Sequence, residues 1–173
     1  PLPLGSVRPL GWLARQLRIQ ADGISGHLDE FWPDIRDSAW FGGDAEGWER
    51  APYWLDGLIP LAYTLDNALL KEKVHRYVGT ILDHQADDGW LGPGVPAGYD
   101  LWAVLLIGKV LAQYYEASGD ARVLAALDAN LRNLDRHGYG ITCNIADAAA
   151  VDNIVSGFAT GVEGCLSVRN TVN

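Results

Sequence analysis

The sequence predicts an all-α fold built from antiparallel helical hairpins. Apolar side chains recur at helical spacing in five segments, at about 10–21, 52–65, 69–85, 101–117 and 121–136. Short turns join the second segment to the third and the fourth to the fifth, and such turns make antiparallel neighbours. Long loops separate the first segment from the second and the third from the fourth. If the hairpins stack side by side, these loops gather at one end, as in an (α/α) toroid.

Each expected helix has an apolar face of its own. The second helix begins near Pro52, a residue suited to a first helical turn. The fourth is apolar on most sides until Gln113, so we expect it to be heavily buried. The inward residues of the first, second, third and fifth helices are Leu10, Leu13, Ala14, Leu17 and Ala21; Leu55, Leu58, Ile59, Ala62 and Tyr63; Val74, Tyr77, Val78, Ile81 and Leu82; and Val123, Leu124, Leu127, Leu131 and Leu134.

The last segment, 138–173, differs in kind from residues 1–137. It contains no tryptophan, few charges and many small residues, and neither helical nor strand periodicity prevails. We expect a divergent tail that is irregular or forms short strands, and we assign it no function.

The charge balance excludes some classes of partner. The formal net charge is −9, whereas nucleic acids and anionic membranes are bound through basic patches. No apolar run has the length of a membrane span, and we expect no signal peptide in the first residues, so the compartment stays unknown. Cys143 and Cys165 lie far apart, and no two histidines have metal-ligand spacing. We therefore expect neither a metal site nor a disulfide.

The segment 27–56, HLDEFWPDIRDSAWFGGDAEGWERAPYWLD, combines eight acidic residues with four tryptophans. The apolar face of an indole needs a partner, and carboxylates are rarely buried unpaired. Sugars satisfy both, because their C–H faces stack on indoles and their hydroxyls donate to carboxylates. The segment therefore predicts a carbohydrate-binding loop. The alternative is an acidic, solvated loop that its tryptophans pin to the core.

Two carboxylates in this segment, Glu49 and Asp37, are weak candidates for catalysis. The adjacent Arg50 favours the anion of Glu49, so we expect Glu49 to bind a hydroxyl or act as a base rather than as an acid. Asp34 is a further substrate-binding candidate, together with Arg50. The alternatives are a loop salt bridge between Glu49 and Arg50, and turn caps for Asp34 and Asp37.

A histidine and several tryptophans complete the substrate-binding candidates. His27 directly precedes the acidic run and could donate to a sugar hydroxyl; the alternative is a structural histidine. Trp90 and Trp102 lie on the second long loop and on the helix that follows it. If both long loops lie at the same end of the helices, five tryptophans could line a sugar-binding cleft. The alternative is that most of the five are core residues, and we expect two or three to be exposed in the cleft. The tryptophans concerned are Trp40, Trp48, Trp54, Trp90 and Trp102.

Several strings in fixed order resemble the bacterial β-L-arabinofuranosidases of glycoside hydrolase family 127 and its relatives. They are GWLARQLRIQADGISGHLDEFWPD, GWERAPYWLDGLIPLAYTLD, DGWLGP and QYYEASGDARVL. The resemblance covers about residues 1–137. It implies an (α/α)6-barrel catalytic domain that acts on terminal sugar residues of glycans. Such a barrel has twelve helices, so the resemblance also implies that this chain supplies only its first part.

The chain departs from that family at several positions. The family's catalytic glutamate and zinc-bound cysteine lie beyond the matched stretch, so the resemblance implies zinc for the full family while its ligands are absent here. A family histidine that contacts arabinose corresponds to Leu106, and a nearby cysteine corresponds to Ala103. The chain is therefore expected to supply substrate-binding loops and to be inactive alone.

We interpret the chain as the N-terminal portion of a glycoside hydrolase acting on a terminal (arabino)furanoside or a related sugar. The first alternative is a non-catalytic carbohydrate-binding or structural helical module, since no complete catalytic pair can be assigned. A polysaccharide lyase-like toroid is the second. A terpenoid cyclase is disfavoured, because Asp87-Asp88 does not continue into D-D-x-x-D. An incomplete barrel leaves a helix face uncovered, which predicts self-association, above all through the helix expected at 101–117.

Overall fold

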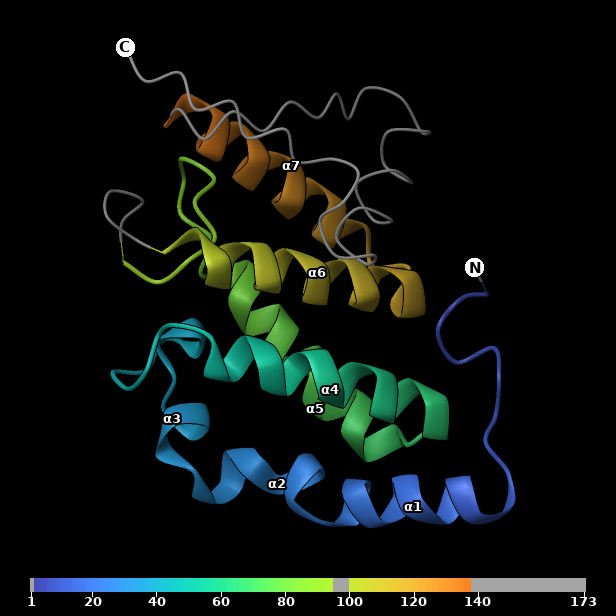
Figure 1. Ribbon diagram of the computed structural model, residues 1–173. Coiled ribbons are helices and arrows are strands. Elements are labelled where there is room, and N and C mark those ends of the chain that lie inside the picture. Colours follow the sequence, from blue (N-terminus) through green and yellow to red (C-terminus); the bar gives the residue numbers. More distant parts are fainter. Residues whose placement is uncertain (1, 95–99, 138–173) are drawn as a thin grey trace.

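The computed structural model describes residues 2–94 and 100–137, and the regular elements in these residues are all helical (Figure 1). The all-α prediction is confirmed for this part of the chain, while the predicted tail at 138–173 lies outside it. The elements are α1 (Gly11–Asp22), α2 (Ile24–Phe31), α3 (Pro33–Arg36), the 3-10 helix η1 (Ala39–Phe41), α4 (Arg50–Leu65), α5 (Ala68–Asp83), α6 (Leu101–Ser118) and α7 (Ala121–Arg136).

Helices α4 and α6 lie side by side and run in the same direction (Figure 1). Trp102 Nε1 donates to Glu49 Oε2, and Lys109 Nζ donates to Asp56 Oδ1, and in each pair the partners are 53 residues apart. Because the sequence separation is the same in both pairs, seven residues along α4 correspond to seven residues along α6, and the two helices are parallel. Helix α5 packs against α4, and α7 packs against α6, so two hairpins are joined through α4 and α6.

The short turns of these hairpins fall where the sequence predicted them. Asp66 ends α4 in the left-handed conformation (φ 53°), and the Asn67 side chain accepts a backbone N–H of the first turn of α5 at 3.1 Å. Gly119 ends α6 with φ 71°, and Asp120 accepts a backbone N–H of α7 at 3.0 Å. A cap of this kind stabilises a helix by about 1 kcal/mol.

The core of the described residues is supplied mainly by α4 and α6, each of which buries nine residues. The prediction that the helix at 101–117 is heavily buried is confirmed. Leu55, Ile59, Ile107 and Leu111 have 0 % of their surface exposed. Burial of one such side chain contributes roughly 1.5–3 kcal/mol. The packing of the two parallel helices therefore fixes the positions of the residues at their N-terminal ends.

The segment after α1 is not the continuous loop that the sequence predicted, because α2, α3 and η1 form within it. Asp29 of α2 is 5 % exposed and accepts hydrogen bonds from Lys73 Nζ at 2.7 Å and Tyr77 OH at 2.9 Å, both on α5. Short helices are marginal by themselves and depend on tertiary contacts. Local periodicity could not reveal α2, because these partners lie more than 40 residues away.

Helix α1 is less buried than its apolar pattern predicted. Ala14 and Ala21 are buried, but Leu10 and Leu13 are 82 % and 43 % exposed, and Trp12 is 71 % exposed. Of the described elements, α1 packs mainly against α2 and α4. The uncovered apolar surface expected on the helix at 101–117 is therefore found on α1 instead.

Candidate functional site

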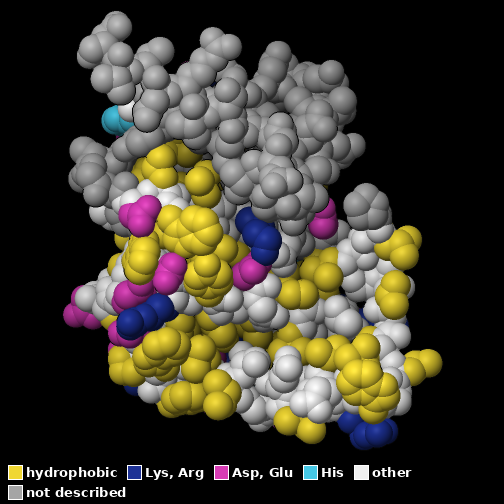
Figure 2. Space-filling view, viewed as in Figure 1, with side chains coloured by type: hydrophobic (Ala, Val, Ile, Leu, Met, Phe, Trp, Pro, Cys, Tyr) yellow, Lys and Arg dark blue, Asp and Glu magenta, His cyan; other side chains and the backbone are white. Residues whose placement is uncertain are grey.

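The N-terminal ends of α4 and α6 bring the two predicted site segments together. Trp48 and Glu49 directly precede α4, while Asp100 and Trp102 flank the start of α6. Figure 2 shows acidic and basic side chains gathered among hydrophobic ones on the side of the molecule where these helices begin. Asp100 Oδ1 accepts the Trp102 backbone N–H at 2.9 Å, which caps α6.

Two indole–carboxylate hydrogen bonds cross between the helix starts in opposite directions. Trp48 Nε1 donates to Asp100 Oδ2 at 3.0 Å, and Trp102 Nε1 donates to Glu49 Oε2 at 3.0 Å. Each segment thus supplies one indole and one carboxylate. Hydrogen bonds to a charged acceptor are stronger than neutral ones, so this exchange holds both rings in place.

The exchange leaves a defined set of groups open. Trp48 and Trp102 are 46 % and 49 % exposed although both N–H groups are satisfied, so the exposed part of each indole is apolar. Both oxygens of Asp100 accept hydrogen bonds. Among the described residues no group donates to Glu49 Oε1. One free carboxylate oxygen between two exposed indoles fits a hydroxylated ring with an apolar face.

Arg50, the residue after Glu49, contacts Asp34 and Trp32. Its guanidinium pairs with the Asp34 carboxylate and lies 5.5 Å from the ring centroid of Trp32. The salt bridge between Arg50 and Glu49, which was the alternative interpretation, is not formed, because Arg50 pairs with Asp34 of α3 instead. Asp34 and Arg50 therefore lie near the site as an ion pair that joins α3 to α4.

A partly buried network of hydrogen bonds next to the site includes Glu46, a residue that the sequence did not single out. Glu46 Oε1 accepts the Glu49 backbone N–H at 3.0 Å, and Trp40 Nε1 donates to the Trp48 carbonyl at 2.7 Å. The Ser38 hydroxyl donates to the Glu46 carbonyl at 2.9 Å. Asp100 was missed as well, although an Asp immediately before an apolar helix is a recognised N-cap signal. These groups fix the backbone at the exposed indole of Trp48.

Three of the five candidate tryptophans belong to the core and two are exposed, which agrees with the expectation that most of them are core residues. Trp40, Trp54 and Trp90 are 3 %, 7 % and 2 % exposed. Trp54 Nε1 donates to the Ser25 carbonyl at 2.9 Å, and its ring meets Tyr77 edge-on with centroids 5.1 Å apart. Trp40 and Trp90 border a small cavity of about 240 Å³. Indoles buried in this way offer no open face for stacking.

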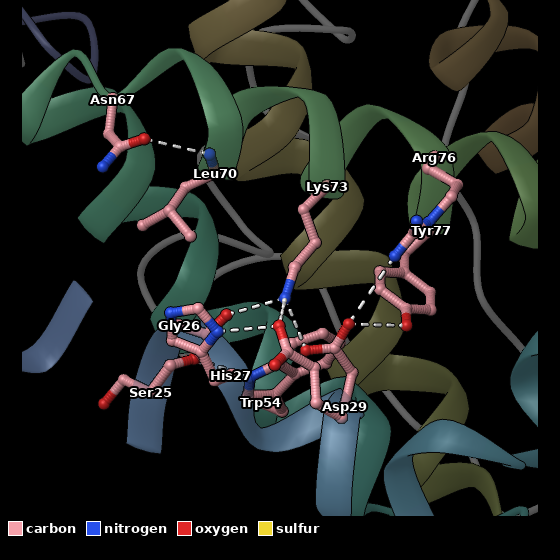
Figure 3. A network of polar contacts seen from close by, with 11 residues as sticks. Ser25, Gly26, His27, Asp29, Trp54, Asn67, Leu70, Lys73, Arg76 and Tyr77 are labelled. Carbon is pink, nitrogen blue, oxygen red and sulfur yellow. Dashed lines mark hydrogen bonds and ion pairs between the residues drawn. The ribbon is translucent and has the colours of Figure 1, made fainter. Parts of the chain in front are cut away.

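His27 lies in a different polar network, which joins α2 to α5 (Figure 3). Its ring nitrogen is 2.7 Å from Glu30 Oε1, and Lys73 contacts Asp29 and the Gly26 carbonyl. These residues do not contact Trp48 or Glu49. His27 instead lines an open pocket of about 600 Å³ formed by α1, α2 and α5.

The Tyr77 hydroxyl completes that network. Burial, followed by its hydrogen bond to Asp29, raises the pKa of Tyr77 to about 12. The phenol therefore stays neutral and donates to Asp29 across the ordinary pH range. Asp29 was not among the predicted site residues, and its burial with three nearby donors indicates a role in holding α2 on α5.

Asp37 is held in a surface ion pair. Arg36 donates to its two carboxylate oxygens at 2.9 and 2.6 Å, and this pairing lowers the pKa of Asp37 below its usual value. A general acid needs the opposite shift. The candidate catalytic role of Asp37 therefore finds no support in its surroundings. The Glu46 carboxylate contacts Glu49 only through the Glu49 backbone N–H.

Comparison with protein-family models, curated proteins and solved structures gave no match for this chain. Across residues 2–94 and 100–137, no three His, Cys, Asp or Glu side chains are grouped so that they could hold a metal ion. We predict no metal site in this chain. The two cysteines, Cys143 and Cys165, lie outside the described residues. Within the described part of the chain, no helix has the length and apolarity needed to cross a bilayer.

Proposed function

We propose that the chain forms the sugar-binding end of an (α/α)6 glycoside hydrolase-like domain that acts on a terminal arabinofuranoside or a related sugar. The observation that carries the proposal is the crossed exchange of Trp48 with Asp100 and Glu49 with Trp102. It leaves two apolar indole surfaces and one carboxylate oxygen open on the same part of the surface.

The chemistry of a sugar ring matches this arrangement. An indole contacts the C–H face of a sugar without needing a hydrogen bond from it, and both indole N–H groups are already used. Glu49 Oε1 can accept one ring hydroxyl. Because the rings are oriented before the sugar arrives, binding does not have to order them, which reduces its entropic cost.

The packing of the hairpins supports the toroidal part of the proposal. Two successive hairpins place their first helices, α4 and α6, in parallel contact, and their second helices, α5 and α7, pack beside them. Repetition of such hairpin pairs is how stacked helical repeats are built. The long segments before α4 and α6 then fall at the same end, where the exposed indoles lie.

A non-catalytic carbohydrate-binding module is the second candidate, and one observation favours it. The Glu49 carboxylate accepts the Trp102 indole N–H, and the other catalytic candidate, Asp37, is paired with Arg36. A glycosidase needs two carboxyl groups about 5–9.5 Å apart across the scissile bond. Binding without turnover is therefore the expected behaviour of this chain in isolation.

The experiment is a titration of the chain with methyl and aryl arabinofuranosides, followed by tryptophan fluorescence. We expect Trp48→Ala and Glu49→Gln each to weaken binding at least about fivefold, the scale of one aromatic or charge-assisted contact. Circular dichroism should show unchanged helical content, since both side chains lie on the surface of the helix start.

The matched controls are Trp12→Ala, which removes an exposed indole on α1, and Asp44→Asn, which removes an exposed acid in the segment 27–56. Both should bind as the wild type does. Equal losses in the controls and in the Trp48 and Glu49 variants would contradict the proposal. Absence of binding to any arabinofuranoside, pyranoside or short oligosaccharide would also contradict it.

A further inference from the structure

The exposed stripe of α4 continues beyond Glu49. Tyr53 and Asp56 follow it by four and seven residues, which places all three on one face of the helix. Tyr53 is 47 % exposed, and the Asp56 side chain is 23 % exposed. Two helical turns separate Glu49 from Asp56, a rise of about 10 Å. This distance is longer than a single sugar ring.

A polar cluster occupies the far end of the stripe. Asp56 Oδ1 accepts from Lys109 Nζ at 2.6 Å and from Gln113 Nε2 at 2.5 Å, both on α6. Among the described residues no group donates to Asp56 Oδ2. Lys109 has three donors and uses one of them on Asp56, and the Gln113 carbonyl oxygen has no partner in the same part of the chain.

The free groups of this cluster include both donors and acceptors. The carboxylate oxygen and the amide oxygen can accept, and the ammonium can donate. Neighbouring sugar hydroxyls each donate and accept, so they match such a set. The ammonium is already neutralised by Asp56, and a ligand with a carboxylate of its own would face the Asp56 charge. The cluster therefore favours a neutral sugar over an acidic one.

We infer that Asp56, Lys109 and Gln113 form a second sugar subsite, and that Tyr53 lies between it and the subsite at Trp48, Glu49 and Trp102. This inference rests on the proposed function and deepens it. The ligand is a neutral oligosaccharide of at least two sugars, laid along the seam of α4 and α6. One sugar contacts the indole end, and the next contacts Tyr53 and the Asp56 cluster.

The test compares a methyl arabinofuranoside with the corresponding neutral disaccharide, using isothermal titration of the full chain. The wild type should bind the disaccharide about tenfold more tightly, which corresponds to about 1.4 kcal/mol. Asp56→Asn should remove most of that gain while changing the affinity for the single sugar less than about twofold, because its lost contacts involve the second sugar alone. Glu49→Gln should weaken both ligands.

A charge exchange separates a binding role from a purely structural one. Asp56→Lys combined with Lys109→Asp retains an ion pair between α4 and α6 but moves the carboxylate to the other helix. If the pair only joins the helices, the exchanged variant should bind the disaccharide as the wild type does, and the inference is overturned. We expect the exchanged variant to melt near the wild-type temperature. We also expect it to bind the disaccharide no more tightly than the single sugar.

The remaining outcomes are also decisive. Equal affinity of the wild type for one and two sugars would overturn the second subsite and leave the proposed function intact. If the wild type bound no sugar at all, both the second subsite and the proposed function would be overturned. Preferential binding of a uronic acid disaccharide would contradict the neutral ligand that the Asp56 charge favours.

Discussion

Asp29 and Lys73 form the most buried ion pair among the described residues, with a carboxylate oxygen 2.7 Å from the ammonium nitrogen and side chains only 4 % and 15 % exposed. The pair joins α2 to α5 across 44 residues of sequence. It also stabilises α2 as a helix, although α2 has only eight residues and contains Gly26. Removing one partner leaves the other charge with only a longer contact to an exposed residue, from Lys73 to Glu30 at 3.3 Å or from Asp29 to Arg76 at 3.6 Å.

We therefore predict that Asp29→Asn destabilises the fold by about 3 kcal/mol, the scale of a broken buried pair. The asparagine keeps the shape of the side chain but leaves Lys73 with only the more distant, exposed Glu30 carboxylate, 3.3 Å away, as a charge partner. Urea denaturation measures the change. Asp128→Asn is the control, because the Asp128 pair with Arg132 lies on the surface of α7. A loss in the control as large as in Asp29→Asn would contradict the assignment.

The pKa of Tyr77 predicts how stability depends on alkaline pH. Burial and Asp29 raise this pKa from 10.0 to about 12, so the folded chain holds the phenolic proton more tightly than the unfolded chain. The stabilisation is fully present below pH 10 and is lost as pH rises from 10 through 12. The pKa of Tyr63 is also about 12, again mainly through burial, and it acts in the same direction.

Denaturation at a series of pH values should thus show stability falling between pH 10 and 12. In Tyr77→Phe the fall should be shallower, because one of the three tyrosines whose pKa is raised has been removed. Tyr53→Phe, which replaces a half-exposed tyrosine, should retain the wild-type slope. Identical slopes in all three proteins would show that Tyr77 does not carry the effect.

The exposed apolar residues of α1 predict concentration-dependent association. Trp12 and Ile19, seven residues apart on one face of α1, are 71 % and 64 % exposed, and Leu10 directly before the helix is 82 % exposed. Exposed apolar surface commonly drives self-association. Light scattering should show larger species as concentration rises, and Trp12→Ser with Ile19→Ser should reduce them. Arg15→Ser on the same helix is the matched control. A monodisperse wild-type monomer that binds no hydrophobic dye would rule this surface out.

We also predict no steady-state turnover of aryl furanosides or pyranosides by residues 1–173. The residues that the family resemblance associates with catalysis have no counterpart here. Asp37 is held as an anion by Arg36, with its pKa lowered. Turnover that persists through repeated purification and is lost in Glu49→Gln would show that a complete catalytic pair exists in the chain.

The helices of the two hairpins could be predicted from sequence because their signals are local. Apolar spacing identifies α4 to α7, and Asn67 and Asp120 mark two of their starts. The site was harder to predict. Trp40, Trp48, Trp54, Trp90 and Trp102 look alike in sequence, and only packing separates the two exposed indoles from the three buried ones.

Long-range partners account for most of what sequence reasoning missed. Asp100 bonds to Trp48 across 52 residues, and Asp56 bonds to Lys109 across 53. No local spacing encodes these pairs, because they depend on the register of α4 against α6. His27 was grouped with the tryptophans by its nearness in sequence, but α2 places it beside α5 instead.

An indole ¹H–¹⁵N NMR spectrum of the chain, recorded while an arabinofuranoside is added, tests the sugar site most directly. The sequence has seven tryptophans, so each indole N–H gives a separate probe. We expect the Trp48 and Trp102 signals to shift together along one saturable curve, while those of Trp40, Trp54 and Trp90 stay in place. Shifts confined to the buried indoles or to Trp12, or no shifts at all, would contradict it.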